Sequence, residues 1–534
     1  MANISLYLRT LSYFKLEQLY FKAYYTARDR FRKFVNYKHN FTLYRKGVAL
    51  KLEECVPVKT SYEANKFTFL NQSVKFSDKI DWEFQDKGTL WAHHLNYFEY
   101  LLQDDMSKAR GSALMYLLID HLPKSHVALS PYSISVRGIN WIKFISKHGI
   151  TRKTVDRYLF CQYRILMDTA AHDRMGHHLL ENAFSMLFGA YYFKGFELFA
   201  EAKIILTREL YEQILPDGGH FQLSPMYHQL MLLGILDSYN VMKNNAVFED
   251  ETLIELLKVS AERMLGWLEK ITYSNGRIPC LNDSVYDVAP STSELIAYAK
   301  RLEISARPVE LKESGYRVFR KGKMEGIIDI GNVGPDYQTM HAHSDTFNFE
   351  LMYDKKPLIV DTGISTFISN NIRGRERSNF SHNTVRLENI NQSEVHDSFK
   401  VGRRAKVTID LDEQDHYIAG HDGYKKHEIM HQREFKVLDD QLLIRDEMVT
   451  SLNDIGSVYS FLHFHPDCTI HKIEANGLLV DDWEIIFEGR VDIKVFDYNY
   501  ALGFNRTRRA KMLQVAFDGE LDTKFVRRQN QSVN

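Results

Sequence analysis

The sequence predicts a multidomain protein with a helical N-terminal part and an antiparallel β-rich C-terminal part. From about residue 90 to 305, apolar residues recur every three or four positions, as on one face of a helix. From about residue 315 onward, apolar and polar residues alternate in short runs, as in half-buried strands. A chain of 534 residues is also too long for one ordinary core, so two large domains are expected.

Three regions are predicted. Residues 1–85 hold one or two amphipathic helices and an irregular or β-like lead-in. Residues 86–308 form consecutive helical hairpins with short turns, which indicates a helical bundle or an α/α toroid. Residues 309–534 contain regular short strands separated by turn signals, which is typical of an antiparallel β-sandwich. The domain boundary is expected near residues 305–308, where the pattern changes.

Composition limits the possible function classes. A hydrophobic share of 44% and a charged share of 26% describe a soluble globular protein. The formal net charge of −1 argues against a nucleic-acid partner, for which a basic domain is expected. The four cysteines lie far apart and form no CxxC pair, so a disulfide framework is not expected.

The first 34 residues are rich in Tyr, Phe, Lys and Arg and show no secretory signal, because no clean apolar run precedes a small-residue cleavage site. An amphipathic helix of this kind either packs on its own domain, which is the commoner case, or lies on an anionic membrane surface. No stretch of the chain approaches the roughly 20 apolar residues that a membrane-spanning helix needs.

The histidine-rich stretch at residues 341–384 carries a possible metal site. His341 and His343 are two positions apart in a predicted strand, so their side chains share a face. A predicted return strand brings Asp361 back beside His343, and His382 follows it. Two histidines and one aspartate are suitable zinc ligands, so one of His341 and His343 could face a metal held with Asp361 and His382, and the other could face a substrate. The alternative is that these histidines are ordinary strand residues.

Two segments of the helical half carry polar residues that require an explanation. His178, Glu181 and Asn182 share one face of an otherwise apolar predicted helix. They belong either to a functional site or to a structural hydrogen-bond cluster, because buried polar groups must be satisfied.

Ser224 and Pro225 are a suitable N-cap and first residue for another helix, which places Tyr227 in its first turn. The helix dipole there favours a phenolate and so eases proton transfer by Tyr227. The alternative is a packed tyrosine.

Short motifs occur in order along nearly the whole chain. The helical half contains Leu90-Trp91, Leu95-Asn96-Tyr97-Phe98, Arg137, Asn140-Trp141, His178-Leu179-Leu180-Glu181-Asn182, Gly218-Gly219, Ser224-Pro225 and Tyr227-His228. The β half contains His341-Ala342-His343-Ser344-Asp345, Val360-Asp361-Thr362-Gly363, Arg377-Ser378, His382-Asn383-Thr384, Gln392-Ser393-Glu394 and Gly402-Arg403-Arg404-Ala405. Each motif is weak alone, but the ordered set resembles the heparinase II/III family of polysaccharide lyases.

This resemblance implies an incomplete α/α toroid followed by an antiparallel β-sandwich, with an acidic polysaccharide in the cleft between them. It also implies β-elimination at a uronic acid, in which a base removes the C5 proton and an acid protonates the leaving O4. By position, Tyr227 is the principal base or acid, and His341 is the second proton-transfer group. His178 and Glu181 occupy positions that bind the carboxylate and organise the site.

The resemblance also implies a metal, and six substrate contacts are predicted beside it. His343, Asp361 and His382 match the family's zinc ligands, where one zinc braces the sandwich beside the cleft. Arg137 could pair with a carboxylate or sulfate, and Trp141 could stack on a sugar, with helix packing as the alternative role for Arg137. The candidate substrate-binding residues are Arg137, Asn140, Trp141, Asn96, Gln222 and His228.

Two positions depart from the family pattern. His177 stands where many relatives have Asn, so it could act as a cationic substitute that neutralises the carboxylate. Phe367 is the aromatic residue found near the position where some relatives carry an extra catalytic Tyr, which weakens any inference about the uronate epimer.

Three function classes follow, and a lyase is favoured. The first alternative is a catalytically silent protein that binds or assembles acidic glycans on the same fold. The second is a zinc-dependent hydrolase, which would need an open metal position that holds a water. The N-terminal segment resembles that of members associated with bacterial capsule or exopolysaccharide synthesis, so a cytoplasmic or cell-envelope location is expected.

Overall fold

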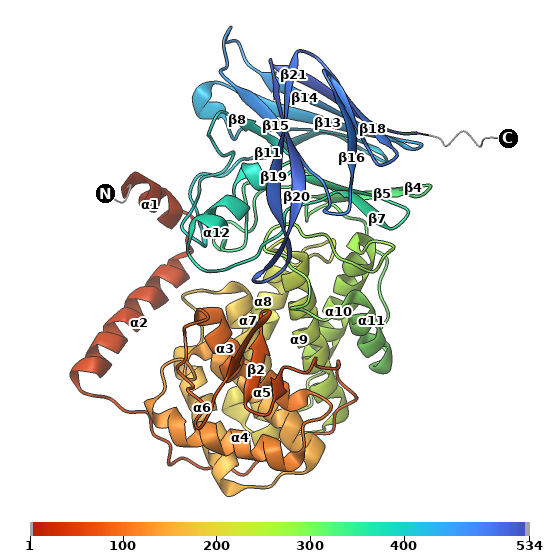
Figure 1. Cartoon of the computed structure of the whole chain (residues 1–534). Coiled ribbons are helices and arrows are strands. Elements are labelled where there is room, and N and C mark those ends of the chain that lie inside the picture. The colour runs from red at the N-terminus through yellow and green to blue at the C-terminus, as the bar shows by residue number, and fades with distance from the viewer. Residues whose placement is uncertain (1–3, 529–534) are drawn as a thin grey trace, which may run out of the picture.

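The computed structural model of the chain describes residues 4–528 (Figure 1). Helices dominate up to Arg301, and antiparallel strands dominate from Tyr316 onward. This order of a helical region and a β-rich region confirms the predicted fold class. The predicted boundary at residues 305–308 falls in the irregular segment between the last long helix and the first strand of the β region.

The N-terminal region contains two helices and a small sheet. The helices are α1 (Ile4–Leu11) and α2 (Leu16–Phe34), and Figure 1 shows them along the outside of the molecule. An extended segment then leads to the antiparallel strands β1 (Tyr62–Glu63), β2 (Lys66–Phe69) and β3 (Gln72–Lys75). Residues 1–3 of the predicted N-terminal helix lie outside the described residues.

The helical region is built around α7, which contacts α5, α6, α8 and α9. Its α-helices are α3 (Thr89–Tyr97), α4 (Lys108–His121), α5 (Pro131–His148), α6 (Lys153–Thr169), α7 (Gly176–Phe193), α8 (Phe196–Gln213), α9 (Pro225–Asn244), α10 (Glu251–Ile271) and α11 (Thr292–Arg301). Two short 3-10 helices accompany them, η1 (Glu99–Leu102) and η2 (Leu122–Lys124).

The predicted start of α9 is confirmed. Ser224 caps the helix by accepting a hydrogen bond from the Tyr227 backbone N–H, and Pro225 is the first helical residue.

Within the described residues, the β region contains one eight-stranded sheet, two four-stranded sheets and one pair of short strands. The eight-stranded sheet has the order β11-β12-β13-β14-β21-β18-β17-β16, and the four-stranded sheets have the orders β19-β20-β15-β8 and β4-β5-β6-β7. The remaining pair is β10-β9. The predicted hairpin around Asp439-Asp440 is confirmed, because β13 and β14 pair on either side of it.

The strands of the three main sheets and the short elements between them have the following bounds. The strands are β4 (Tyr316–Lys321), β5 (Met324–Asp329), β6 (Phe349–Tyr353), β7 (Lys356–Ile359), β8 (Val385–Leu387), β9 (Val395–His396), β10 (Lys400–Val401), β11 (Val407–Glu413), β12 (His416–His421), β13 (Met430–Leu438), β14 (Gln441–Val449), β15 (Val458–His463), β16 (Ile470–Glu474), β17 (Gly477–Val480), β18 (Trp483–Glu488), β19 (Val491–Gly503), β20 (Arg506–Phe517) and β21 (Glu520–Arg527). The helical elements are α12 (Asn371–Glu376), η3 (Asn379–Ser381) and η4 (Lys425–His427).

The two regions pack against each other through apolar side chains. The large core of the helical region, which includes Trp91, Trp141 and Trp267, also includes Tyr316 and Ile327 from the β region. A second core fills the β region itself. Because burial of apolar surface is the main stabilising contribution, this shared core fixes the helical region against the sheets.

Within the described residues, no helix combines the length and the apolar character that crossing a bilayer requires.

Candidate active site

Four of the five residues expected to be catalytic form one aromatic cluster between the two regions. The Tyr227 and His341 rings lie 3.9 Å apart between centroids, and the His177 ring lies 4.7 Å from Tyr227 and 5.1 Å from His341. The His178 ring lies 4.1 Å from His177. The helical region supplies three of these rings, and the β region supplies His341.

Backbone conformations that are rare for L-residues precede the functional segments. Met175, Leu223 and Asn282 have φ angles of 55°, 56° and 53°. Such residues are uncommon and cost energy, and they occur most often where a site requires a fixed geometry. Gly176 has a φ of 58°, and a Cβ there would meet the Gln338 side chain at 2.2 Å. Glycine at this position therefore allows α7 to start with its histidines beside the β region.

Asp283 links His341 to His343 and was not predicted. One of its carboxylate oxygens lies 2.8 Å from His341 Nδ1, and the other lies 2.8 Å from His343 Nε2. A carboxylate accepts hydrogen bonds, so each imidazole donates the N–H that faces Asp283. His341 Nε2 and His343 Nδ1 are then the unprotonated nitrogens of the neutral rings. Within the described residues, both of these buried atoms have no hydrogen-bond partner.

Arg373 holds Asp283 in its ionised form. The Arg373 guanidinium donates to both carboxylate oxygens, with Nη2 at 2.7 Å from one of them. Burial alone would raise the pKa of Asp283, but Arg373 and the two imidazole N–H groups hold that pKa well below its usual value. Arg377, the residue that follows the end of the same short helix, donates to the Ala342 carbonyl between the two histidines.

The predicted strand around His341 and His343 is wrong. Both residues lie in an irregular segment, and the strand β6 begins only at Phe349. Phe347 has a φ of 69°, which an extended strand cannot accommodate. The two side chains nevertheless point the same way, because both bond to Asp283.

The expectation that Tyr227 favours its phenolate is also wrong. Burial raises the pKa of Tyr227 far above its usual value, and the Asp283 carboxylate raises it further. These effects outweigh the helix N-terminus. The phenol is therefore neutral at neutral pH, and 9% of the side chain remains exposed.

His177 is a neutral hydrogen-bonded imidazole, which corrects the suggestion of a cationic substitute. Burial holds the pKa of His177 well below its usual value, and neighbouring histidines lower it further. Its Nδ1 lies 3.1 Å from Gln222 Oε1, and Gln222 in turn donates to Gln338. Gln222, an expected substrate contact, thus positions His177 and is itself buried.

His178 and Glu181 are half-buried and follow the same face of α7. Burial, then the nearby Arg174, lowers the pKa of His178 well below its usual value. Burial, then Asp237, raises the pKa of Glu181 to about 7. Asn182 has a structural role, because it bonds to the Ala171 N–H and the Ser135 hydroxyl in the interior.

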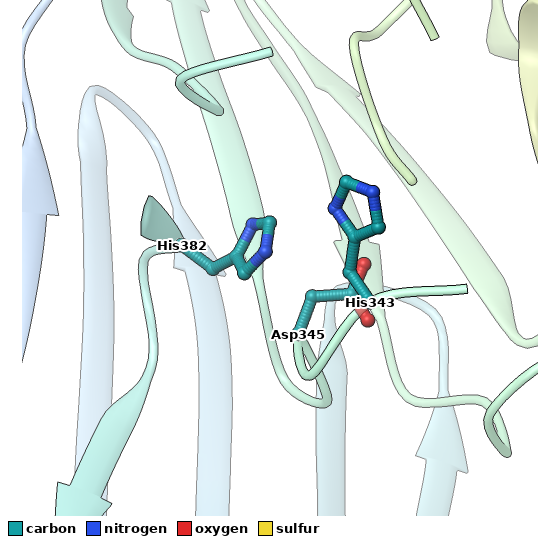
Figure 2. A group of neighbouring side chains, drawn as sticks. All are labelled: His343, Asp345 and His382. Carbon is teal, nitrogen blue, oxygen red and sulfur yellow. The ribbon is translucent and has the colours of Figure 1, made fainter. Parts of the chain in front are cut away.

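Three buried groups have the composition of a metal site. Atoms of His343, Asp345 and His382 lie within 4.8 Å of one another, and Figure 2 shows the three side chains converging. Within the described residues, His343 Nδ1, Asp345 Oδ2 and His382 Nε2 have no hydrogen-bond partner. Leaving such atoms unsatisfied is costly, and a divalent cation would satisfy all three. Two imidazoles and one carboxylate also form a suitable ligand set for zinc.

The predicted ligand Asp361 does not belong to this group of three, and the structure places it beside His382. Asp361 Oδ2 lies 2.7 Å from His382 Nδ1, and Asp361 also accepts bonds from Asn348 and the Gly363 N–H. Metal-binding histidines usually donate their other N–H to a carboxylate. Asp361 orients His382 in this way, as Asp283 orients His343, and Asp345 is the carboxylate that faces the two free nitrogens.

Arg137 and Trp141 lie in the interior, so the structure does not support direct contact with a substrate. Both side chains are fully buried. The Arg137 guanidinium donates to Gln162 Oε1 and to the carbonyls of Asn96 and Ala128. It therefore joins α5 to α6 and to the end of α3, which is the helix-packing role.

The other expected substrate contacts are also buried. Asn96 donates to the Trp82 and Ala92 carbonyls, and Asn140 donates to the Tyr97 carbonyl. His228 Nδ1 accepts from the His220 N–H, and its Nε2 lies 3.0 Å from the Met264 carbonyl. Each of these side chains therefore bonds to backbone groups in the interior of the protein.

Asp283, Arg373 and Asp345 were missed as functional residues. Asp283 lies in an irregular segment 58 residues before His341, so no periodic pattern links the two. Arg373 lies on a short helix that no run of apolar residues marks in the sequence, so nothing linked it to Asp283. Asp345 follows His343 by two residues, and this spacing was the available signal for a ligand.

The fold and this site together define a two-part protein in which a helical region and a β-rich region meet at one histidine- and tyrosine-lined site. Residues 134–302 match the family described as "Heparinase II/III N-terminus", and residues 303–533 match "Heparinase II/III-like, C-terminal". The chain belongs to the heparinase II/III family.

Similar proteins include a heparin-sulfate lyase from Bacteroides stercoris, which is 25% identical over 311 residues. That match covers 52% of this chain and 44% of the relative, so the aligned part spans less than half of the relative's length. Among solved structures, a heparinase III has a TM-score of 0.66 at 16% identity, covering 85% of this chain and 80% of that chain. A mutant of a heparan sulfate lyase from Pedobacter heparinus has a TM-score of 0.57 at 15% identity, covering 88% and 82%. These structural likenesses establish the fold.

Proposed function

We propose that this protein is a polysaccharide lyase that cleaves a uronate-containing acidic polysaccharide by β-elimination. The observation that carries the proposal is the pairing of Tyr227 with His341, whose free Nε2 belongs to a ring oriented by Asp283. The family and the lyase relative support the same reaction class. In this reaction the C5–H and C4–O4 bonds break, a C4=C5 double bond forms, and O4 leaves with a proton.

His341 is the proposed base. Its Nδ1–H is donated to Asp283, so the lone pair of Nε2 is available to accept the C5 proton. Asp283 then stabilises the imidazolium that forms, as the aspartate of a hydrolase triad does for its histidine.

Tyr227 is the proposed acid. Its neutral phenol donates a proton to O4 as the C4–O4 bond breaks, and the resulting phenolate is restored by proton return from His341. The two rings are neighbours, with 3.9 Å between their centroids. The place of Tyr227 in the first turn of α9 fixes its direction.

Arg174 is the proposed partner of the substrate carboxylate, because neither His177 nor His178 is cationic. Arg174 is exposed at the turn before α7, and among the described residues it has no ion-pair partner. It precedes by two residues the start of α7, the helix that carries His177 and His178. A cation there would offset the carboxylate charge and so acidify the C5 proton.

The proposed metal is one zinc held by His343, Asp345 and His382. When bound, it would supply a fixed positive charge that organises the irregular segment carrying His341. Asp361 and Asp283 would orient the two histidine ligands.

Two alternative functions differ from a lyase in the products that they would form. A silent glycan-binding protein would bind acidic polysaccharide without producing new ends. A zinc-dependent hydrolase would produce new reducing ends without a double bond. The buried position of the metal group favours the lyase, because a hydrolase would need an open metal position that holds a water.

The test is a panel of acidic polysaccharides incubated with purified protein. Ultraviolet absorbance of unsaturated uronate and the number of reducing ends are measured together. We expect both to rise in equal amounts with at least one uronate-containing polymer. New reducing ends without absorbance would identify a hydrolase, and binding without either signal would identify a silent protein.

A further inference from the structure

Helix α2 carries an apolar stripe that faces away from the protein. Leu16, Tyr20, Phe31 and Phe34 are 84%, 65%, 64% and 85% exposed. Leu19, Ala23, Tyr24 and Ala27 continue the same face, since all eight positions recur at spacings of three and four residues. Single exposed apolar residues are normal, but a continuous exposed stripe marks an interaction surface. We call these eight residues the outer stripe.

The opposite face of α2 anchors the helix to the body. Gln18 is buried and donates to the Arg174 and Tyr337 carbonyls, so it touches both regions of the protein. Tyr25 donates to the Ala170 carbonyl at 2.7 Å, and Arg32 pairs with Asp168 at 2.7 Å. The Phe21 ring stacks on His172 at 4.6 Å between centroids. These contacts fix the orientation of α2 and leave the outer stripe exposed.

Basic side chains border the outer stripe. Lys22, Arg30 and Lys33 are exposed along one edge of it, and no ion pair involves them within the described residues. Residues 4–34, which span α1 and α2, hold seven Lys and Arg but only two acidic residues, whereas the whole chain has a net charge of −1. The positive charge is therefore concentrated on the arm that α1 and α2 form.

The two arm helices also enclose an open apolar groove. Tyr7 and Leu11 of α1 face Leu19, Ala23 and Ala27 of α2 across a space of about 390 Å³. Lys22 and Arg30 stand at its edge. The groove thus continues the outer stripe toward α1. Figure 1 shows both helices at the periphery of the molecule, where a large planar partner can reach them.

We propose that α1 and α2 bind the surface of an anionic lipid membrane. The outer stripe would lie at the boundary between headgroups and acyl chains, and Lys22, Arg30 and Lys33 would contact lipid phosphates. This combination of an apolar face, Tyr and Phe side chains and flanking basic residues is typical of helices that lie in the membrane interface.

Charge favours lipid over the other candidate occupants. In a two-fold symmetric dimer, the outer stripe of one chain would pack on the outer stripe of the other. The basic residues beside the two stripes would then lie close together and repel one another. A soluble acidic glycan would neutralise the basic residues but would not bury the exposed Leu and Phe side chains. An anionic bilayer complements both features.

The test is flotation of the full chain with vesicles of phosphatidylcholine alone or mixed equally with phosphatidylglycerol. We expect binding to the anionic vesicles that weakens with added salt, and little binding to the neutral ones. Since each basic residue near an anionic surface contributes about 1 kcal/mol, or about fivefold in partitioning, a Lys22→Glu, Arg30→Glu, Lys33→Glu variant should bind at least tenfold more weakly.

A second variant tests the apolar part. Leu16→Ser, Phe31→Ser and Phe34→Ser alter only exposed side chains, so the protein should fold normally and lose at least tenfold in partitioning. The matched control is Ile473→Ser with Phe496→Ser, two exposed positions on the β region that should not affect binding.

The proposal would be overturned if the wild-type chain did not bind anionic vesicles. It would also be overturned if the variant that lacks the three apolar side chains bound them as well as wild type. A wild-type dimer that this same variant converts to a monomer, without vesicle binding, would assign the outer stripe to a second copy. Binding of soluble acidic glycan that depends on the basic residues alone would assign the arm to substrate.

Discussion

At the scale of single residues, one carboxylate fixes two histidines for different tasks. Asp283 accepts from Nδ1 of His341 and from Nε2 of His343, so the two rings present opposite nitrogens. The free nitrogen of His341 belongs to the ring that lies beside Tyr227, and that of His343 lies beside Asp345. The proposed proton transfer and the proposed metal site therefore share one charge, which Arg373 stabilises.

Arg174 gives a prediction at this scale. Arg174→Ala should raise KM for the polymer at least tenfold, because an exposed cation that pairs with the substrate carboxylate is lost. Arg174→Lys retains the charge and should recover part of the loss. Steady-state kinetics on the preferred polymer measure both. An unchanged KM in Arg174→Ala would show that another group offsets the carboxylate.

Glu181 gives a prediction about pH and stability. Its pKa in the folded protein is raised to about 7, above the unfolded value, so folding favours its protonated form. Its ionisation therefore destabilises the fold increasingly as pH rises from about 4.5 to about 7, and the penalty is constant above that. Glu181→Gln should be more stable than wild type by about 1–3 kcal/mol at pH 8 but not at pH 4.

Urea denaturation at the two pH values measures this difference. Equal stabilities at pH 8 would mean that the Glu181 carboxylate is solvated in the folded protein.

At the scale of elements, sequence periodicity predicted much of the fold. The Ser224-Pro225 start of α9 and the hairpin at Asp439-Asp440 were found because local chemistry determines helix caps and turns. The extended backbone expected at His341 was not found, because Phe347 adopts a positive φ that only the surrounding packing explains. Arg137 was misjudged because a charged residue on a helix gives no sign of which neighbours will bury it.

The loops that converge at the metal group give a prediction about which aspartate, Asp345 or Asp361, binds the metal. Purified protein should contain about one zinc per chain, and a His343→Ala, His382→Ala variant should contain none. Asp345→Asn should lose most of the metal, because it removes a ligand. Asp361→Asn should retain metal at about 10–100-fold lower affinity, because it removes only the hydrogen bond that orients His382.

Elemental analysis and titration with a competing chelator measure these affinities. Complete loss of metal in Asp361→Asn with retention in Asp345→Asn would restore Asp361 as the ligand.

The packing of α5 gives a prediction about stability. Arg137→Ala should lower the free energy of unfolding by about 3 kcal/mol or more, because it leaves buried carbonyls unsatisfied and creates a cavity. The KM of the folded fraction should not change, since Arg137 is fully buried. Denaturation curves and kinetics below the melting temperature test both parts. A raised KM at unchanged stability would show that Arg137 contacts the substrate.

At the scale of the whole molecule, the candidate active site exists only where the two regions meet. The helical region contributes His177, His178 and Tyr227, while the β region contributes His341 and Arg373. The shared apolar core holds these groups within ring-contact distance. Helix α2 bonds to both regions through Gln18, so the arm that we propose to bind membrane also reinforces this junction.

The most direct test of the proposed reaction is the elimination rate of Tyr227→Phe on the polymer that wild type cleaves. This change keeps the ring and removes only the ionisable oxygen, so the variant should fold and bind polymer. We predict that the rate of unsaturated-uronate formation falls by about 10²–10⁴-fold, the usual contribution of an acid–base group. Tyr239→Phe is the matched control, since Tyr239 lies on the same helix with the same 9% exposure and should retain the wild-type rate. A Tyr227→Phe variant that forms unsaturated ends at a similar rate to wild type would contradict the account.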